Sequence, residues 1–245
     1  MKNAGLLRYA PYQLWDYLRD KGIATVIVTA LLATISLLGI RALGPGRTLA
    51  NVDPELLKGA FRSTLSTFVV IGSLFAVNGI VANDRKQGYH RFLFSKPVSI
   101  PAYYAQLFGV TALGLVLLAC LVAGAYALLV TPIFPARLPV AVLAAFAVVG
   151  GVGFLFSTFW RFDWLSTVLV FTLSSILNGI FADGGGLAKI ALKLLPPTER
   201  LEGVVQAALQ DLPIPMDDLT AAVAYGLICL ALGLLHLRTR SFVVT

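Results

Sequence analysis

Long uninterrupted runs of apolar residues, separated by short charged segments, are the dominant pattern along this chain. A transmembrane helix needs about 20 consecutive, mostly apolar residues. Six stretches meet that requirement: residues 23–40, 64–82, about 104–130, 139–160, 164–182 and 219–237. The pattern predicts an all-α integral membrane protein with six transmembrane helices, which together form one six-span domain over residues 23–245.

Composition and charge exclude a soluble enzyme. The 245-residue chain is 58% hydrophobic and 13% charged, whereas soluble proteins carry about 25% charged residues. Its net charge of +7 comes from 19 Lys and Arg that lie almost entirely between the apolar runs, which is the distribution that orients a membrane protein. With the amino terminus inside, the inner segments hold more of these basic residues, so we expect a multi-pass protein with both termini in the cytoplasm.

Residues 1–22, before the first apolar run, are predicted to form a cytoplasmic amphipathic helix. Leu14, Trp15 and Leu18 fall on one helical face, and the charged residues fall elsewhere. Trp15 and Tyr17 suit the headgroup level of a bilayer, so we expect this helix to lie at the membrane interface. The alternative is an ordinary turn next to the membrane with solvated charges.

Residues 183–218, between the fifth and sixth spans, are too long for a simple hairpin loop. Apolar residues repeat at helical spacing in 187–195 and again in 198–209, and two prolines separate these stretches. We expect two short outer helices, the second capped by Thr198, that either re-enter the membrane or lie on its surface. A small extracellular cap fits the pattern equally well. The predicted apolar face of the second helix consists of Leu201, Val204, Val205, Ala208 and Leu209.

Groups that could carry catalysis or bind a metal ion are scarce in the predicted spans. None has Asp, Glu, Lys or Arg in its central part, and Cys120 and Cys229 lie far apart with no His at ligand spacing. The chain contains no HExxH, no GxSxG and no GxxxxGK[ST] sequence to hold nucleotide phosphates. We therefore expect no catalytic residue, metal site or cofactor in this chain, which by itself is not an enzyme.

The second and fifth spans carry weakly polar side chains. Such groups most often bond to backbone or to a neighbouring helix. The functional alternative is that the two helices line a shared substrate pathway. The candidates for lining it are Ser73, Asn78, Ser174, Ser175 and Asn178.

The inner loop 83–101, after the second span, reads NDRKQGYHRFLFSKPVSIP and alternates charged with large aromatic residues. Basic and aromatic side chains next to a membrane either contact anionic headgroups or dock a partner protein. Composition alone favours the contact with lipid.

This loop also resembles part of a known family. A charged run, Gly88, a hydrophobic cluster and then Ser-Lys-Pro-Val-Ser at 95–99 lead into the third span. This arrangement is similar to the stretch after the second span in the ABC-2 type permeases of bacterial ABC exporters. Residues 194–198, Leu-Leu-Pro-Pro-Thr before a short helix, resemble the family's segment between spans five and six. The order of elements matches the family along the whole chain.

In that family the inner loop is a coupling helix that docks onto a separate ATPase subunit. The resemblance implies that the ATPase contacts here are Asp84, Arg85, Lys86, Gly88, Tyr89, Arg91 and Phe92. Arg161 and Asp163, in the turn between spans four and five, would provide a second contact. The amino-terminal helix would be the connecting helix, which touches the ATPase through Tyr12, Trp15 and Arg19.

The resemblance therefore implies a permease subunit of an ATP-driven exporter in the bacterial plasma (inner) membrane. Two permeases, either two copies or this chain with a related one, would form the pathway as a dimer. Two ABC ATPase subunits would bind ATP and Mg, membrane lipid would surround the spans, and no nucleic acid would be bound. Two alternatives stay open: a membrane subunit that couples ATP hydrolysis to a partner protein without transport, and a membrane-embedded lipid-modifying enzyme.

Overall fold

A computed structural model describes residues 9–24, 53–78, 80–81, 99–129, 134–159, 163–181 and 194–239, with isolated positions at 26, 27, 30, 31, 34, 38 and 192. Within these residues every regular element is a helix. The elements are α1 Ala10–Tyr17, η2 Leu18–Gly22, α3 Pro54–Val77, α6 Ile100–Leu129, α7 Leu138–Ala145, η4 Phe146–Gly150, α8 Gly151–Phe159, α9 Asp163–Phe181, α11 Thr198–Leu209 and α12 Met216–Thr239. The two elements labelled η are single π-helical turns.

Five of these helical stretches are long and apolar enough to cross a membrane: Glu55–Val77, Ile100–Leu128, Leu138–Phe159, Trp164–Phe181 and Met216–Thr239. They correspond to the second to sixth predicted spans. The first predicted span, 23–40, lies largely outside the described residues. The described part of the chain is thus all-helical, and its five candidate spans indicate a membrane protein.

The second span begins ten residues earlier than the apolar pattern predicted. Asp53 caps α3, because its Oδ1 accepts a hydrogen bond from the backbone N–H of Glu55 at 2.9 Å, and Pro54 takes the first helical position. The first turns of α3 are polar, with Lys58 bonded to Glu55 at 2.7 Å. The pattern of apolar runs does not predict this start, because the cap at Asp53 sets it and the first turns of the helix are polar.

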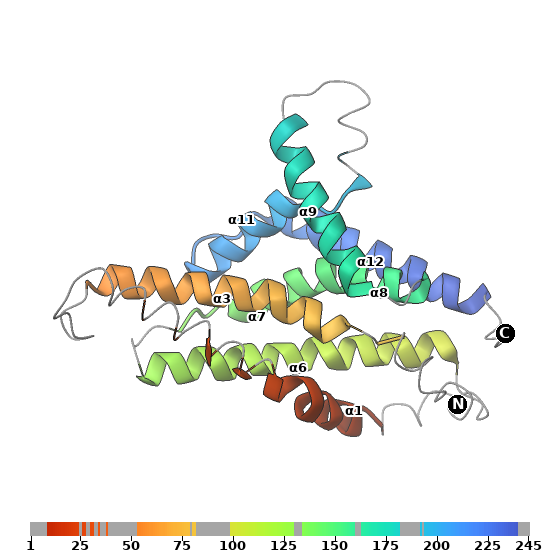
Figure 1. The fold of residues 1–245 in the computed structure, drawn as a ribbon, viewed down its shortest axis with the longest axis horizontal. Coiled ribbons are helices and arrows are strands. Elements are labelled where there is room, and N and C mark those ends of the chain that lie inside the picture. The colour runs from red at the N-terminus through yellow and green to blue at the C-terminus, as the bar shows by residue number, and fades with distance from the viewer. Residues whose placement is uncertain are drawn as a thin grey trace.

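The long helices alternate in direction (Figure 1). In this view α3, the α7–η4–α8 helix and α12 run one way, and α6, which lies below them, runs the opposite way. We call the end at which α3, α8 and α12 finish and α6 begins the proximal end, and the opposite end the distal end. The short helix α1 lies along α6.

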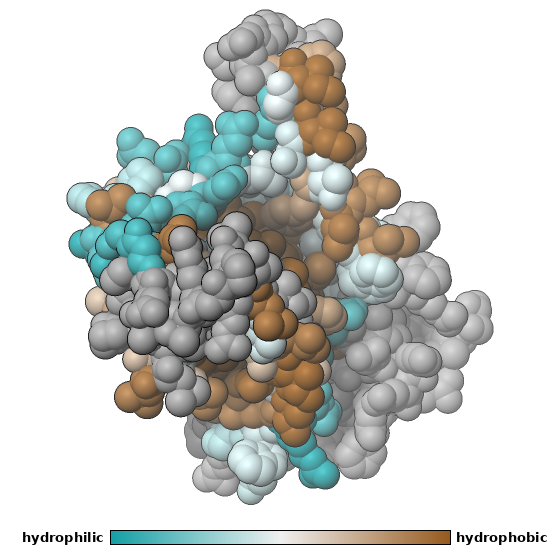
Figure 2. All heavy atoms as spheres, turned by 60° about the vertical axis from the view of Figure 1, so that its left-hand side comes forward, coloured by the Kyte–Doolittle hydropathy of each residue, from teal (hydrophilic) through white to brown (hydrophobic). Residues whose placement is uncertain are grey.

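The α7–η4–α8 helix forms the centre of the bundle. In its most apolar stretch 72% of residues are buried, against 11% for α9. Aromatic rings fill the space around it: Phe108 of α6 contacts Phe146 at 4.6 Å between centroids, and Phe61 of α3 stacks on Tyr126 at 4.4 Å. Helix α9 stands away from the bundle as a mainly apolar column beside the hydrophilic surface of α11 (Figure 2).

Helix α12 crosses the central helix at backbone contact. A Cβ atom added to Gly226 would overlap the Ala147 carbonyl and lie 2.8 Å from the backbone nitrogen of Val148, both in the π-helical turn η4. A Cβ added to Gly151 would in turn meet the backbone of Gly226. These glycines therefore let the fourth span pack closely, because small residues allow membrane helices to approach one another.

The predicted apolar face of α11 is confirmed, because all five of its residues are buried. It packs against α7, α12 and α3, while Glu199, Arg200 and Glu202 are exposed. The apolar face of α11 therefore contacts the bundle rather than lipid. The prediction that Thr198 caps this helix is wrong: Pro197 is the N-cap residue, Thr198 is the first helical residue, and no side chain makes the capping bond.

Helix α1 lies within the predicted amphipathic segment and has Pro11 in its first turn, but its faces differ from the prediction. Tyr17 is 7% exposed and its ring fills the space beside Gly114 of α6, whereas Trp15 is 67% exposed. Tyr17 therefore packs against α6, and Trp15 alone of the two aromatics lies on the exposed side of the helix. In a helix Tyr17 shares a face with Leu14, three residues away, and Trp15 does not.

Replacing Gly226 with Ala should destabilise the fold, because the new Cβ meets backbone atoms of η4 that cannot turn aside. We expect the free energy of unfolding to fall by about 1–3 kcal/mol, measured by chemical or thermal unfolding of the purified protein in detergent. Gly109→Ala in α6 is the matched control, since a Cβ there meets nothing within 4 Å. An equal effect of the two substitutions would contradict the close crossing.

Candidate functional site

The predicted ATPase contacts of the inner loop, from Asp84 to Phe92, lie outside the described residues, as does Arg161. Asp163 is the first residue of α9, and its side chain is also outside the description. The structure does place the elements on either side. The inner loop connects α3 to α6, and Arg161 lies in the connection from α8 to α9. Both connections start from the proximal end (Figure 1).

The three predicted contact residues of the amino-terminal helix share its outer side. Tyr12 and Trp15 are 72% and 67% exposed, and Arg19, one turn after Trp15, is exposed as well. The opposite side holds Tyr17 against α6, and Gln106 of α6 donates a hydrogen bond to Gln13 at 3.0 Å. The helix is thus fixed to α6 by one side and leaves the predicted contact side open.

Lys21, which sequence reasoning missed, joins the amino-terminal segment to the end of α3. Its ammonium group donates to the carbonyl oxygens of Ala76 at 3.0 Å and Asn78 at 2.5 Å. The last carbonyls of a helix lack partners within the helix, and a cation there is favourable. The sequence feature that could have indicated this contact is the spacing of Lys21. It follows Leu14, Tyr17 and Leu18 at helical spacing, on the side that faces the bundle.

Two of the predicted pathway residues lie in α3 or at its end. Ser73 is fully buried, and its hydroxyl donates to the carbonyl oxygen of Val69 at 2.6 Å, one turn earlier. This is the kind of backbone bond that weakly polar side chains in spans most often make, and not an exposed hydroxyl on a pathway. Asn78 is half-buried at the C-cap of α3, where its backbone carbonyl oxygen accepts the hydrogen bond from the Lys21 ammonium group.

The predicted pathway residues of α9 divide between two sides of that helix. Ser174 is fully buried and donates to the carbonyl oxygen of Pro196 at 2.7 Å, and the Asn178 amide donates to the Thr198 hydroxyl at 3.3 Å. Ser175 is exposed on another side. Ser174 and Asn178 therefore bind the chain that leads into α11, and Ser175 does not.

The segment before α11 is thereby held from two helices. Besides the bonds from Ser174 and Asn178, the hydroxyl of Tyr225 in α12 donates to the carbonyl oxygen of Leu194 at 3.0 Å. Prolines cannot donate backbone bonds, and carbonyls next to them need side-chain partners when they are buried. These three bonds fix the Leu-Leu-Pro-Pro-Thr segment at 194–198, and so fix where α11 starts.

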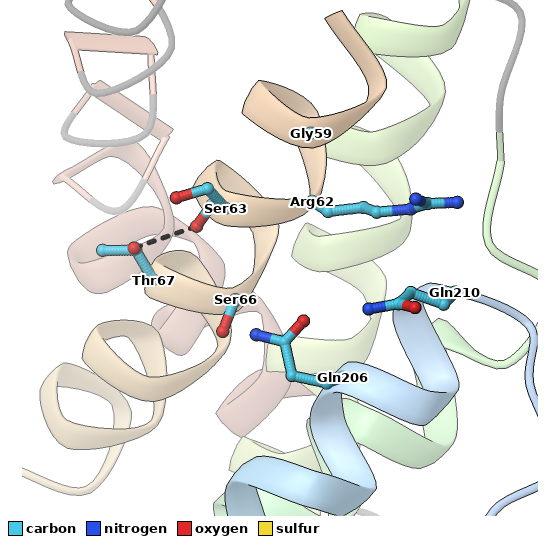
Figure 3. A pocket seen from close by; sticks show the side chains of 7 residues that line it. All are labelled: Gly59, Arg62, Ser63, Ser66, Thr67, Gln206 and Gln210. Carbon is cyan, nitrogen blue, oxygen red and sulfur yellow. Dashed lines mark hydrogen bonds between the residues drawn. The ribbon is translucent and has the colours of Figure 1, made fainter. Parts of the chain in front are cut away.

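A polar pocket of about 330 Å³ lies between α3 and α11 (Figure 3). Helix α3 contributes the guanidinium of Arg62, and α11 contributes two amides at its carboxyl end. In Figure 3 the amide of Gln206 faces Ser66, and Arg62 extends from α3 on the side of Gln210. Among the described residues no acidic side chain lines the pocket, whose walls are Gly59, Arg62, Ser63, Ser66, Thr67, Gln206 and Gln210.

Other chemistry is sparse in the described part of the chain. No cluster of three or more His, Cys, Asp and Glu side chains is placed to hold a metal ion among the described residues. Cys120 and Cys229 are free thiols within spans. Comparison with known proteins gives no match, either to a model of a protein family or to a curated protein.

Replacing Ser174 with Ala should destabilise the protein, because the buried carbonyl of Pro196 loses its partner. We expect the free energy of unfolding to fall by about 1 kcal/mol, measured by unfolding in detergent. The neighbouring Ser175→Ala is the control and should change it by less than about 0.5 kcal/mol, since that side chain is exposed. Equal effects would contradict the division of α9 into two sides.

Proposed function

We propose that this chain is a permease subunit of an ATP-driven ABC transporter, an exporter of the bacterial inner membrane. The observation that carries the proposal is that the helices before the two expected ATPase-contact segments, α3 and α8, both end toward the proximal end of the bundle. The connection between α3 and α6 starts there, and so does the connection between α8 and α9. One ATPase on that side of the membrane could then touch both.

The contacts of Lys21 support a mechanical role for that end. A force applied at the inner loop reaches α3, because the loop follows α3 directly. It also reaches the amino-terminal segment, because Lys21 bonds to the last carbonyls of α3. In the proposed mechanism, closure of two ATPases around ATP moves the loops and shifts the permeases between inward and outward access. Such a shift requires that the ATP-bound and ATP-free ATPases bind the two permease conformations with different affinity.

The exposure of α9 supports pairing with a second permease. Only 11% of residues 164–181 are buried, although the helix carries polar side chains. Thr172, Ser175 and Gly179 are exposed and follow one another at helical spacing, so they form a weakly polar stripe. In a dimer this stripe would face either the partner or a pathway between the two chains, and lipid would cover the remaining apolar surface.

Replacing both Tyr89 and Phe92 with Ala should detach the ATPase, because the double variant removes two aromatic anchors and changes no span. Interface anchors contribute about 2 kcal/mol each, so recovery of the ATPase in a mild-detergent pull-down should fall by about tenfold or more. Membrane insertion should be unchanged.

The control for this double variant is Phe134→Ala, which removes an exposed aromatic at the distal end and should leave ATPase recovery as in the wild type. Unchanged recovery with the double variant would refute the coupling-loop assignment. If ATPase binding is lost as expected but the reconstituted wild-type complex moves no substrate, the chain couples ATP hydrolysis to a partner rather than to transport.

A further inference from the structure

We propose that the pocket between α3 and α11 binds a phosphate group, carried either by a lipid headgroup or by a small soluble anion. The proposal does not depend on ATPase docking, because the pocket lies among helices of this chain and away from the proximal end. It rests on the charge of the pocket, on its unused hydrogen-bond donors and on its size.

Arg62 brings a positive charge that nothing in the described part of the chain neutralises. The ion pairs found among described residues join Lys58 to Glu55 and Arg200 to Asp218. Arg62 takes part in neither, and its Nε is buried without a hydrogen-bond partner among the described residues. A partly buried charge is costly unless it is paired, so an anion that enters the pocket would provide the partner that Arg62 lacks.

The surrounding donors are also unused. The side chains of Ser63, Ser66, Gln206 and Gln210 make no hydrogen bond within the described residues, and all four line the pocket with Arg62. The hydroxyl of Thr67 donates to the carbonyl oxygen of Ser63 at 2.9 Å, so its proton is already bound. Hydroxyl and amide protons around one guanidinium can together satisfy several anionic oxygens.

The number of donors favours phosphate over a carboxylate. Arginine binds phosphate and carboxylate equally well in a two-bond geometry. A phosphate group, however, has more oxygen atoms to satisfy than a carboxylate, and four further polar side chains reach this pocket. A volume of about 330 Å³ is large enough for a phosphate with an attached headgroup, since ligand pockets begin near 300 Å³.

The position of the pocket is compatible with a lipid source. Its α3 residues extend from near the start of that helix to its middle, and Val70, one turn beyond Ser66 and Thr67, is 41% exposed. Ser63, Ser66, Thr67 and Val70 follow helical spacing along one face, which passes from polar to apolar. A lipid could place its phosphate at Arg62 and its chains along the apolar part.

The test measures ligand retention by the purified full chain with two probes. Native mass spectrometry compares phosphatidylglycerol with diacylglycerol, which has the same chains without phosphate, and thermal unfolding is followed in a titration with inorganic phosphate. We expect phosphatidylglycerol to be retained and diacylglycerol not, or inorganic phosphate to raise the unfolding temperature. Retention of the lipid alone identifies a headgroup site, and an effect of phosphate alone identifies a soluble anion. If the chain neither retains phosphatidylglycerol selectively nor is stabilised by inorganic phosphate, the proposal is wrong.

Two variants with matched controls test the residues. Arg62→Gln should lower phosphate affinity about tenfold, which is the size of one charge-assisted bond. Lys58→Gln, one turn earlier on α3 and already paired with Glu55, should not. Gly59→Trp should block the pocket, because a Cβ there meets nothing within 4 Å, and Gly203→Trp on the exposed side of α11 is its control. Equal effects of variant and control would refute the site.

Unfolding without any anion gives a further readout. Because Arg62 has no partner among the described residues, Arg62→Gln should leave the unfolding temperature unchanged or raise it. A clear fall would show that another part of the chain already pairs with Arg62, and would overturn the proposal even if the variant binds no phosphate.

Discussion

The crossing of α12 over the central helix sets the arrangement of the other elements. Gly226 and Gly151 bring two backbones into contact at the π-helical turn η4, and no side chain other than hydrogen fits there. Within a membrane, helices associate by close packing rather than by the hydrophobic effect, so such contacts carry much of the specificity. With α12 fixed against η4 and α8, the buried face of α11 packs against α7 and α12, and Tyr225 of α12 reaches the chain before α11.

Polar bonds then connect this core to both ends of the bundle. At the proximal end Lys21 bonds to the last carbonyls of α3 and so joins the amino-terminal segment to the end of that helix. Before α11, bonds from Ser174, Asn178 and Tyr225 fix the two-proline segment, and α11 in turn closes the polar pocket over α3. The two proposals therefore use different parts of the bundle: the ATPase contact would lie at the proximal end, and the anion site lies between α3 and α11.

Apolar run length predicted the five described spans to within a few residues, except at the polar start of α3, and helical spacing predicted the buried face of α11. These features depend on local composition. The partners of Ser174 and Lys21 could not be predicted, because they lie 22 and at least 55 residues away in sequence. The same holds for the pocket, which forms only when α11 packs on α3. Asp84 to Phe92 lie outside the described residues, so their role stays a prediction.

The most direct test of the account is a mild-detergent pull-down of the tagged chain from its native membrane, with mass spectrometry of the proteins recovered. We predict a soluble protein with a phosphate-binding GxxxxGK[ST] loop, in about equal amount to the chain, since the proposed complex contains two copies of each. Recovery of the chain without any such ATPase, under conditions that keep other membrane complexes intact, would contradict the assignment as an ABC permease.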